Sequence, residues 1–291
     1  MGILLLLLGS CLNISEGFFT KKNSVRTGGK GGFLFSSIIS MFAMLFFVVM
    51  VVLKKGQPQF IPEMWIYGIL AGIFYCTASF LTYVALGCGP FALSMLIISY
   101  CLIFTIGYGL LTGEASSFGV LQYIGLAFIL VSLYLTRGES SGENKVSAKW
   151  LVSIVVTSVL NGFFGIDRRM QQVRFNGEYD YEFMIITLGI STVILFVLGL
   201  IKDGLPNFDG ASIGYAVGTG LCNGGNNCCN LLVNTGVIAM PLALSAPLGS
   251  GIRIVLSFLV SCFLFKEHFL KRQIAGVALG GAAIVLLNIR L

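Results

Sequence analysis

Long apolar stretches recur along the whole chain and are separated by short polar, glycine-containing or proline-containing segments. A helix needs roughly 20 apolar residues to cross about 30 Å of hydrocarbon, and most of these stretches approach that length. No interval between them is long enough to fold as a separate soluble domain. The pattern predicts an all-α integral membrane protein with ten transmembrane helices, near residues 2–18, 31–53, 64–86, 90–111, 119–136, 149–168, 183–201, 211–235, 241–265 and 272–290.

The first stretch, MGILLLLLGSCLN, has a second interpretation as a signal peptide. It lacks the positively charged start of such peptides, and part of it matches a later helix. We therefore expect it to be the first transmembrane helix.

An internal repeat divides the chain. PFALSMLIIS at residues 90–99 matches PLALSAPLGS at residues 241–250, a separation of 151 positions. Ser10, Leu12 and Asn13 match Ser158, Leu160 and Asn161 at a separation of 148 positions, and a three-residue insertion between the two points would reconcile the offsets. The repeat predicts a first five-helix unit at residues 1–136, a polar linker at 137–148 and a second five-helix unit at 149–291.

An odd number of crossings per unit forces the second copy to enter the membrane from the opposite face. The two units are therefore expected to be inverted repeats. This architecture is typical of alternating-access carriers, in which homologous halves enclose a site near the middle of the bilayer.

Several features together carry a family resemblance. They are the five-plus-five layout, the spans that run from Pro90 to Glu114 and from Pro241 to Glu267, and the closing helices QYIGLAFILVSLYL and QIAGVALGGAAIVLL. The chain resembles EamA-type carriers of the drug/metabolite transporter superfamily over nearly its whole length. The resemblance implies a carrier fold, whereas members move solutes as different as amino acids, sugars, nucleotide sugars and drugs.

The segment LCNGGNNCCNLLVNTG places five asparagines inside a stretch that has no charge from Ala211 to Ile252. At about 100° per residue, four of them lie within about 60° of one another and the fifth extends the arc to about 100°. A buried amide without a partner costs roughly 1–3 kcal/mol, so a stripe of five facing lipid is untenable. We expect the stripe to line a central cavity and bind substrate, although amides can also join helices. Its members are Asn223, Asn226, Asn227, Asn230 and Asn234.

Arg253 lies in the middle of the ninth span, where a charge is costly. It is expected to meet either a substrate carboxylate or phosphate, or a structural partner such as an acidic side chain or backbone carbonyls. Pro247 is expected to break or kink the helix just before it.

The remaining wall of the cavity is predicted from the repeat. Asn13 and Asn161 occupy matching positions, and Tyr75 and Tyr83 in the third span correspond to the asparagine-rich eighth span. We expect all four side chains to bind substrate. The glycine pair Gly68 and Gly72 is expected to allow close helix packing.

Glu16 near the end of the first span resembles the proton-binding acid of the small multidrug members of this superfamily. It precedes Lys21 and Lys22 by only a few residues, so the sequence favours an interfacial carboxylate neutralised by lysine. If it is buried instead, it becomes a candidate for proton coupling. Asp167, Arg168 and Arg169 are interpreted as a charge cluster on the loop side of the sixth span.

Composition and charge exclude other classes. The chain of 291 residues is 56% hydrophobic and 10% charged, and its formal charge of +6 is scattered over short loops, which argues against nucleic acid. The only histidine, His268, lies in a basic segment without a nucleophile or paired carboxylates, so no enzyme, metal or cofactor is predicted.

The sequence therefore predicts a secondary active transporter that moves a small polar or anionic metabolite by alternating access. The alternative is a multidrug or cationic-compound exporter with Glu16 as its proton-coupling acid. The expected partners are a small-molecule substrate, the lipid bilayer and a coupling proton or an exchanged metabolite. We expect a monomer in the cell membrane. The basic residues of the loops place both termini outside, whereas the resemblance implies cytoplasmic termini.

Overall fold

The structure, a computed structural model, describes residues 1–113, 119–136, 147–204, 209–234, 240–265 and 271–288, and within these ranges every regular element is helical. Before residue 137 the elements are α1 (Gly2–Thr27), α2 (Gly32–Lys55), α3 (Met64–Cys88), α4 (Phe91–Ile98), the short 3-10 helix η1 (Ser99–Cys101), α5 (Leu102–Leu111) and α6 (Val120–Thr136). After it they are α7 (Ala148–Arg174), α8 (Asp180–Lys202), α9 (Gly210–Asn234), α10 (Leu242–Leu264) and α11 (Lys271–Asn288). Because α4, η1 and α5 follow one another directly, a helical rod lies at each of the ten predicted spans.

Two helices extend well beyond their predicted ends. α1 continues to Thr27 and stops at Gly28, which has the left-handed φ of 61° that favours glycine. α7 continues to Arg174. Hydropathy predicts where the chain leaves the hydrocarbon, whereas backbone hydrogen bonds decide where a helix ends. The polar turns that follow the apolar stretches of α1 and α7 keep their helical hydrogen bonds, so both helices are longer than predicted.

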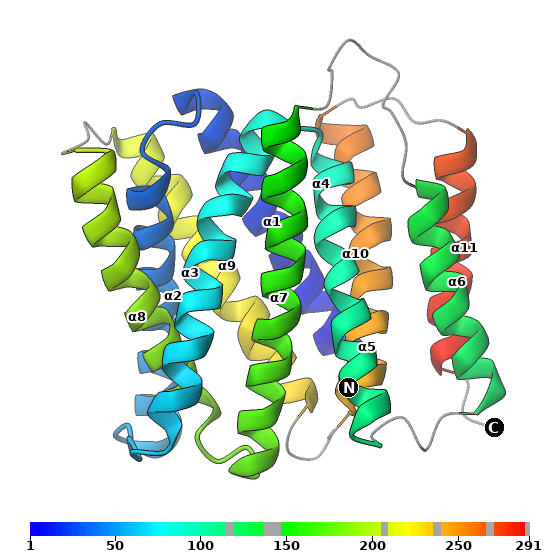
Figure 1. The fold of residues 1–291 in the computed structure, drawn as a ribbon, viewed down its shortest axis with the longest axis horizontal. Helices are drawn as coiled ribbons and strands as arrows, with labels where there is room; N and C mark the ends of the chain where they lie inside the picture. Colours follow the sequence, from blue (N-terminus) through cyan, green and yellow to red (C-terminus); the bar gives the residue numbers. More distant parts are fainter. Residues whose placement is uncertain (114–118, 137–146, 205–208, 235–239, 266–270, 289–291) are drawn as a thin grey trace.

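Length and composition qualify seven helical segments to cross a membrane, so the chain is a membrane protein. They are Gly2–Thr27, Gly32–Lys55, Met64–Cys88, Phe91–Leu111, Ala148–Arg174, Asp180–Lys202 and Pro247–Leu264. α6 and α11 carry shorter apolar segments, and α9 carries the asparagines. Successive rods nevertheless run in alternating directions through one bundle, with α9 behind α3 in the view of Figure 1.

The packing of the helices follows a recurring scheme. α1 packs along α9, and α7 packs along α3. α2 also contacts α9, as α8 contacts α3, while α2 pairs with α8 and α6 pairs with α11. When each rod is matched with the rod five places away, the contact of α1 with α9 maps onto that of α7 with α3, and the contact of α2 with α9 maps onto that of α8 with α3. The pairs α2 with α8 and α6 with α11 map onto themselves. The pair α6 and α11 stands at one edge of the bundle (Figure 1).

Polar contacts tie α2 to α8 at both ends. At one end, the carboxylate of Asp203 accepts hydrogen bonds from the backbone amides of Phe33 and Leu34, over 3.0 and 3.3 Å. At the other end, Lys55 Nζ lies 2.9 Å from a carboxylate oxygen of Glu182. The two helices therefore form a fixed support beside α3 and α9.

The predicted glycine packing is confirmed where α3 meets α8. A Cβ atom at Gly68 would lie 2.5 Å from Cγ2 of Ile186, and one at Gly72 would lie 2.9 Å from Cγ2 of Ile190. Neither distance admits a methyl group, so both glycines are needed for the observed helix separation.

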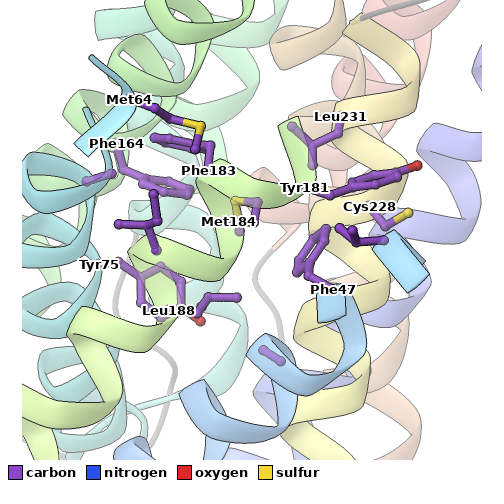
Figure 2. Close-up of a cluster of buried hydrophobic side chains, with 14 residues drawn as sticks. Phe47, Met64, Tyr75, Phe164, Tyr181, Phe183, Met184, Leu188, Cys228 and Leu231 are labelled. Atoms are coloured by element: carbon purple, nitrogen blue, oxygen red, sulfur yellow. The ribbon is translucent and has the colours of Figure 1, made fainter. Parts of the chain in front are cut away.

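The largest cluster of buried apolar side chains lies where α2, α3, α7, α8 and α9 meet. Figure 2 shows Phe47 and Tyr181 on one side of it and Tyr75 and Phe164 on the other. The rings of Tyr75 and Phe164 pack edge to face, with centroids 5.7 Å apart. This cluster fixes one wall of the site described below.

The two spans of the internal repeat differ in their helical geometry. The first is interrupted by η1 at Ser99–Cys101, whereas α10 continues through Pro247 from Leu242 to Leu264. Pro247 therefore does not break the helix, and the kink that was the alternative there stays a prediction. A helix keeps its course past a proline when neighbouring groups replace the lost backbone hydrogen bond. Glu114, Glu267, His268 and most of the predicted linker, residues 137–146, lie outside the described residues.

Candidate functional site

Two adjoining cavities lie inside the bundle, with volumes of about 130 and 160 Å³. Each can hold several water molecules, and both are lined by α1, α7 and α9. We call the first the glutamate cavity and the second the arginine cavity, after the charged residues in their walls. The two cavities share a wall, and we call the pair the polar passage. The shared wall consists of Asn13, Ile98, Asn161, Phe164 and Asn226.

In the glutamate cavity, a chain of hydrogen bonds joins three helices. The hydroxyl of Tyr75 donates to Oδ1 of Asn223 over 2.7 Å, and Nδ2 of Asn223 donates to a carboxylate oxygen of Glu16 over 2.9 Å. Asn227 donates to the same Oδ1 of Asn223 over 3.1 Å. The second carboxylate oxygen of Glu16 is buried and has no hydrogen-bond partner among the residues that the structure describes.

The asparagine stripe faces this passage, as its helical period indicates. Asn223 and Asn227 line the glutamate cavity, Asn230 and Asn234 line the arginine cavity, and Asn226 lines both. Their amides also bond along the helix. Asn230 donates to the backbone and side-chain oxygens of Asn226 over 2.9 and 3.0 Å. Asn227 donates in the same way to Asn223, so two of the five amides satisfy the asparagine one turn before them. Asn234 instead accepts from Ser245 over 2.7 Å.

Two arginines line the arginine cavity. Arg253 from α10 donates to Oγ of Ser250 over 3.0 Å, and no carboxylate of the described residues lies in salt-bridge contact with it. Arg168 from α7 lies with its guanidinium 5.7 Å from the ring centre of Phe164 and interacts electrostatically with Arg253 and Asp180. Two like charges in one small cavity create a strongly positive end.

Arg168 was not predicted to belong to the site. The interpretation of Asp167 and Arg168 as a loop-side cluster is wrong, because α7 runs on to Arg174 and only 8% of Arg168 and 5% of Asp167 is exposed. The helical period could have predicted this position. Arg168 lies seven residues after Asn161, which is two turns along the same face of the helix.

The interpretation of Glu16 as an interfacial carboxylate neutralised by lysine is also wrong. The amines of Lys21 and Lys22 lie over the rings of Phe265 and Phe18, at 4.6 and 5.6 Å, and the Glu16 carboxylate bonds to Asn223 in the cavity wall. Lysines five and six residues away leave Glu16 on a different face of α1.

Tyr83 does not line either cavity, so its place in the predicted binding set is corrected. Its hydroxyl donates to the backbone oxygen of Lys30 over 3.1 Å and lies 2.7 Å from Oγ1 of Thr27. Nδ2 of Asn23 also donates to it, over 3.4 Å. Thr82, directly before Tyr83, still lines the glutamate cavity, so Tyr83 faces away from the cavity and its hydroxyl closes the turn after α1.

A charged contact lies near this end of the bundle. Arg26 pairs with Asp209, and its guanidinium donates to Oδ1 of Asp209 over 2.8 Å. The backbone amide of Ser212 donates to the same oxygen over 3.1 Å, so Asp209 caps the start of α9. The hydrogen bonds from Arg26 and Ser212 hold the pKa of Asp209 well below its usual range.

The passage therefore offers amide donors and acceptors along its wall, a carboxylate at one end and two guanidinium groups at the other. Such groups bind small solutes with hydroxyl, carbonyl or charged groups in preference to apolar ones. Within the described ranges, no three His, Cys, Asp or Glu side chains gather at a spacing that could hold a metal ion.

Comparison with known proteins supports the fold alone. No protein-family model matches the chain, and no curated protein matches it in sequence. Among solved structures, one described only as a crystal structure of a protein superposes with a TM-score of 0.69 at 17% sequence identity. The match covers 99% of this chain and 96% of that one, so the chain shares the fold of that protein over nearly its whole length.

Proposed function

We propose that this protein is a secondary active transporter that moves a small polar or anionic metabolite across the membrane by alternating access. The observation that carries the proposal is the polar passage between helices of both halves, α1 from the first and α7, α9 and α10 from the second. A water-filled or ligand-filled passage gives buried amides and charges the partners that hydrocarbon cannot supply.

The scheme of helix packing supports two inverted halves as the moving parts. Rods that alternate in direction and repeat after five crossings have opposite orientations in the membrane. Two such halves can exchange conformations, so that the site opens first to one side and then to the other. We include membership of the EamA-type carriers in this proposal, on the residues that resemble them.

The amide stripe and Arg253 would bind the solute. Each amide left without a partner in a closed bundle costs roughly 1–3 kcal/mol, and a bound polar solute would offset that cost. The guanidinium of Arg253 suits a carboxylate or phosphate, because it presents several donors in one plane.

Solute flux tests the proposal. The purified protein would be reconstituted in liposomes that are preloaded with unlabelled amino acids, sugars or organic anions, and entry of the matching labelled solute would be followed. We expect saturable entry that is accelerated by unlabelled solute inside, and that Asn227→Leu reduces at least tenfold. Leu221→Ala on the exposed face of α9 serves as the control and should retain flux. Flux that neither saturates nor responds to internal solute, or currents above carrier rates, would identify a channel instead.

One observation favours a second candidate, an exporter of cationic compounds. Glu16 lies in a cavity wall, and one of its carboxylate oxygens has no hydrogen-bond partner among the described residues, so this oxygen is available to a cation or a proton. Two arginines in the adjoining cavity oppose it, because they repel cations. A cationic dye compared with an organic anion in the same liposomes separates the candidates, since only the second should be carried if the first proposal holds.

A further inference from the structure

The charged residues of the passage are separated by sign. Glu16 lines the glutamate cavity, whereas Arg168 and Arg253 line the arginine cavity. Between them lie only uncharged side chains, including Asn13, Asn161 and Asn226. The passage therefore has a negative and a positive end, joined by amides.

Contacts along α1 give the offset of these ends along the helix axis. Ser10 donates to the backbone oxygen of Gly249 over 3.5 Å, and the guanidinium of Arg253 packs against Gly249 and bonds Ser250. Arg253 therefore lies level with Ser10. Glu16 is six residues further along the same helix, and six residues rise about 9 Å.

The axial offset and the two cavity volumes, about 130 and 160 Å³, suit a small solute that carries a charged group at each end. An ammonium group meets a carboxylate, and a carboxylate meets guanidinium groups, through charge-assisted hydrogen bonds.

Unpaired polar atoms occur at both ends. The second carboxylate oxygen of Glu16 and Nε of Arg168 are buried without a hydrogen-bond partner in the described part of the chain. Asp180 interacts with Arg168 across space, while its carboxylate accepts from Gln172 over 3.2 Å. Asp180 thus offsets part of one positive charge, and Arg253 has no carboxylate in contact within the described ranges.

We infer that the solute is a short zwitterion, bound with its anionic group at Arg168 and Arg253 and its ammonium group at Glu16. The inference rests on the proposed transport function and narrows its substrate class. A solute with only one charge would leave the charge at one end of the passage without a partner, which costs binding free energy. Arg168 is then a specificity-determining residue in addition to Arg253.

Matched analogues with altered charge test this inference. The probes are the zwitterions glycine, L-serine and β-alanine, their N-acetyl derivatives, which keep only the negative charge, and their methyl esters, which keep only the positive charge. Binding to the purified protein would be measured by thermal shift and by displacement of labelled L-serine. We expect at least one zwitterion to bind at least tenfold more tightly than both of its singly charged analogues.

Variants test which end of the passage binds which charged group of the solute. Glu16→Gln should weaken zwitterion binding at least tenfold and leave the N-acetyl derivatives unaffected, whereas Arg168→Gln should weaken both. Arg174→Gln, at the exposed end of α7, is the control and should change neither. Tighter binding of an N-acetyl derivative or an ester by the wild type, or no binding of any zwitterion, would overturn the inference.

Flux measurements keep the two proposals separate. If the protein carries a sugar or a simple anion but binds no zwitterion, it is a transporter and the zwitterion inference is wrong. If a zwitterion binds with the expected charge dependence but does not cross the liposome membrane, the binding site stands and the transport proposal is wrong.

Discussion

Asn223 on α9 donates a hydrogen bond of 2.9 Å to Glu16 on α1, and the same amide accepts one of 2.7 Å from Tyr75 on α3. One asparagine therefore holds three helices at the wall of the glutamate cavity. Its side chain is buried, so each group that it satisfies would otherwise lack a partner.

Replacement of Asn223 should destabilise the protein, because Glu16 and Tyr75 each lose a hydrogen-bond partner. Asn223→Leu removes a donor from the Glu16 carboxylate and an acceptor from Tyr75, and should lower the free energy of unfolding by about 1–3 kcal/mol. Chemical denaturation in detergent measures the change. Thr77→Val, which removes a hydrogen bond at the exposed face of α3, should cost much less. In the double variant with Glu16→Leu, the loss should be smaller than the sum of the single losses, and strict additivity would contradict the pairing.

Arg253 should be needed to bind anionic solutes although it lowers the free energy of unfolding. Its side chain is half-buried, bonds Ser250 and lies near the like charge of Arg168. Arg253→Leu should therefore raise the free energy of unfolding by about 1 kcal/mol or more while it abolishes binding of anionic solutes. Arg174→Leu, at an exposed position, should alter neither quantity. A large loss of stability in Arg253→Leu would instead show that the arginine has a structural partner.

The glycines of α3 should be irreplaceable where they meet α8. A Cβ at Gly68 would lie 2.5 Å from Ile186, so Gly68→Ala should lower the free energy of unfolding by about 1–3 kcal/mol. Gly214 on α9 has no atom within 4 Å of the added Cβ, so Gly214→Ala should be neutral or slightly stabilising. Parallel denaturation of the two variants measures the difference, and equal losses would contradict the packing.

The contact between Arg26 and Asp209 should give stability that depends on pH. Folding lowers the pKa of Asp209 below its usual 3.8, mainly through its hydrogen bond from Arg26. Because the folded-state pKa is depressed, the stabilisation is complete well above pH 3.8 and is lost as the pH falls through and below that value.

Thermal unfolding between about pH 6 and pH 3 measures this effect, since carboxylates near their ordinary pKa titrate in that range. Wild type should exceed Asp209→Asn in melting temperature at pH 6, and the difference should shrink toward pH 3. Arg26→Gln should show the same reduced dependence. A difference that stays constant across this range would exclude the ion pair as its source.

Much of the fold follows from the sequence alone. Apolar runs fix where helices form, because a buried backbone in hydrocarbon must satisfy its own hydrogen bonds, and each of the ten predicted spans is helical. The period of 3.6 residues fixes which side chains share a face, so the asparagine stripe from Asn223 to Asn234 could be assigned to a cavity before any contact was known. The inverted relationship of the halves remains a prediction from the repeat.

Tertiary packing alone decided which other residues reach that cavity. Arg168 lies in it because α7 continues beyond the apolar run, and Glu16 lies in it because α9 places Asn223 beside α1. Tyr83 lies outside it because it faces away from the cavity, although Thr82 directly before it still lines the wall. Local patterns report the face and the hydropathy of a residue, whereas the partner across a cavity is set by helix ends and crossings that involve residues far apart in the chain.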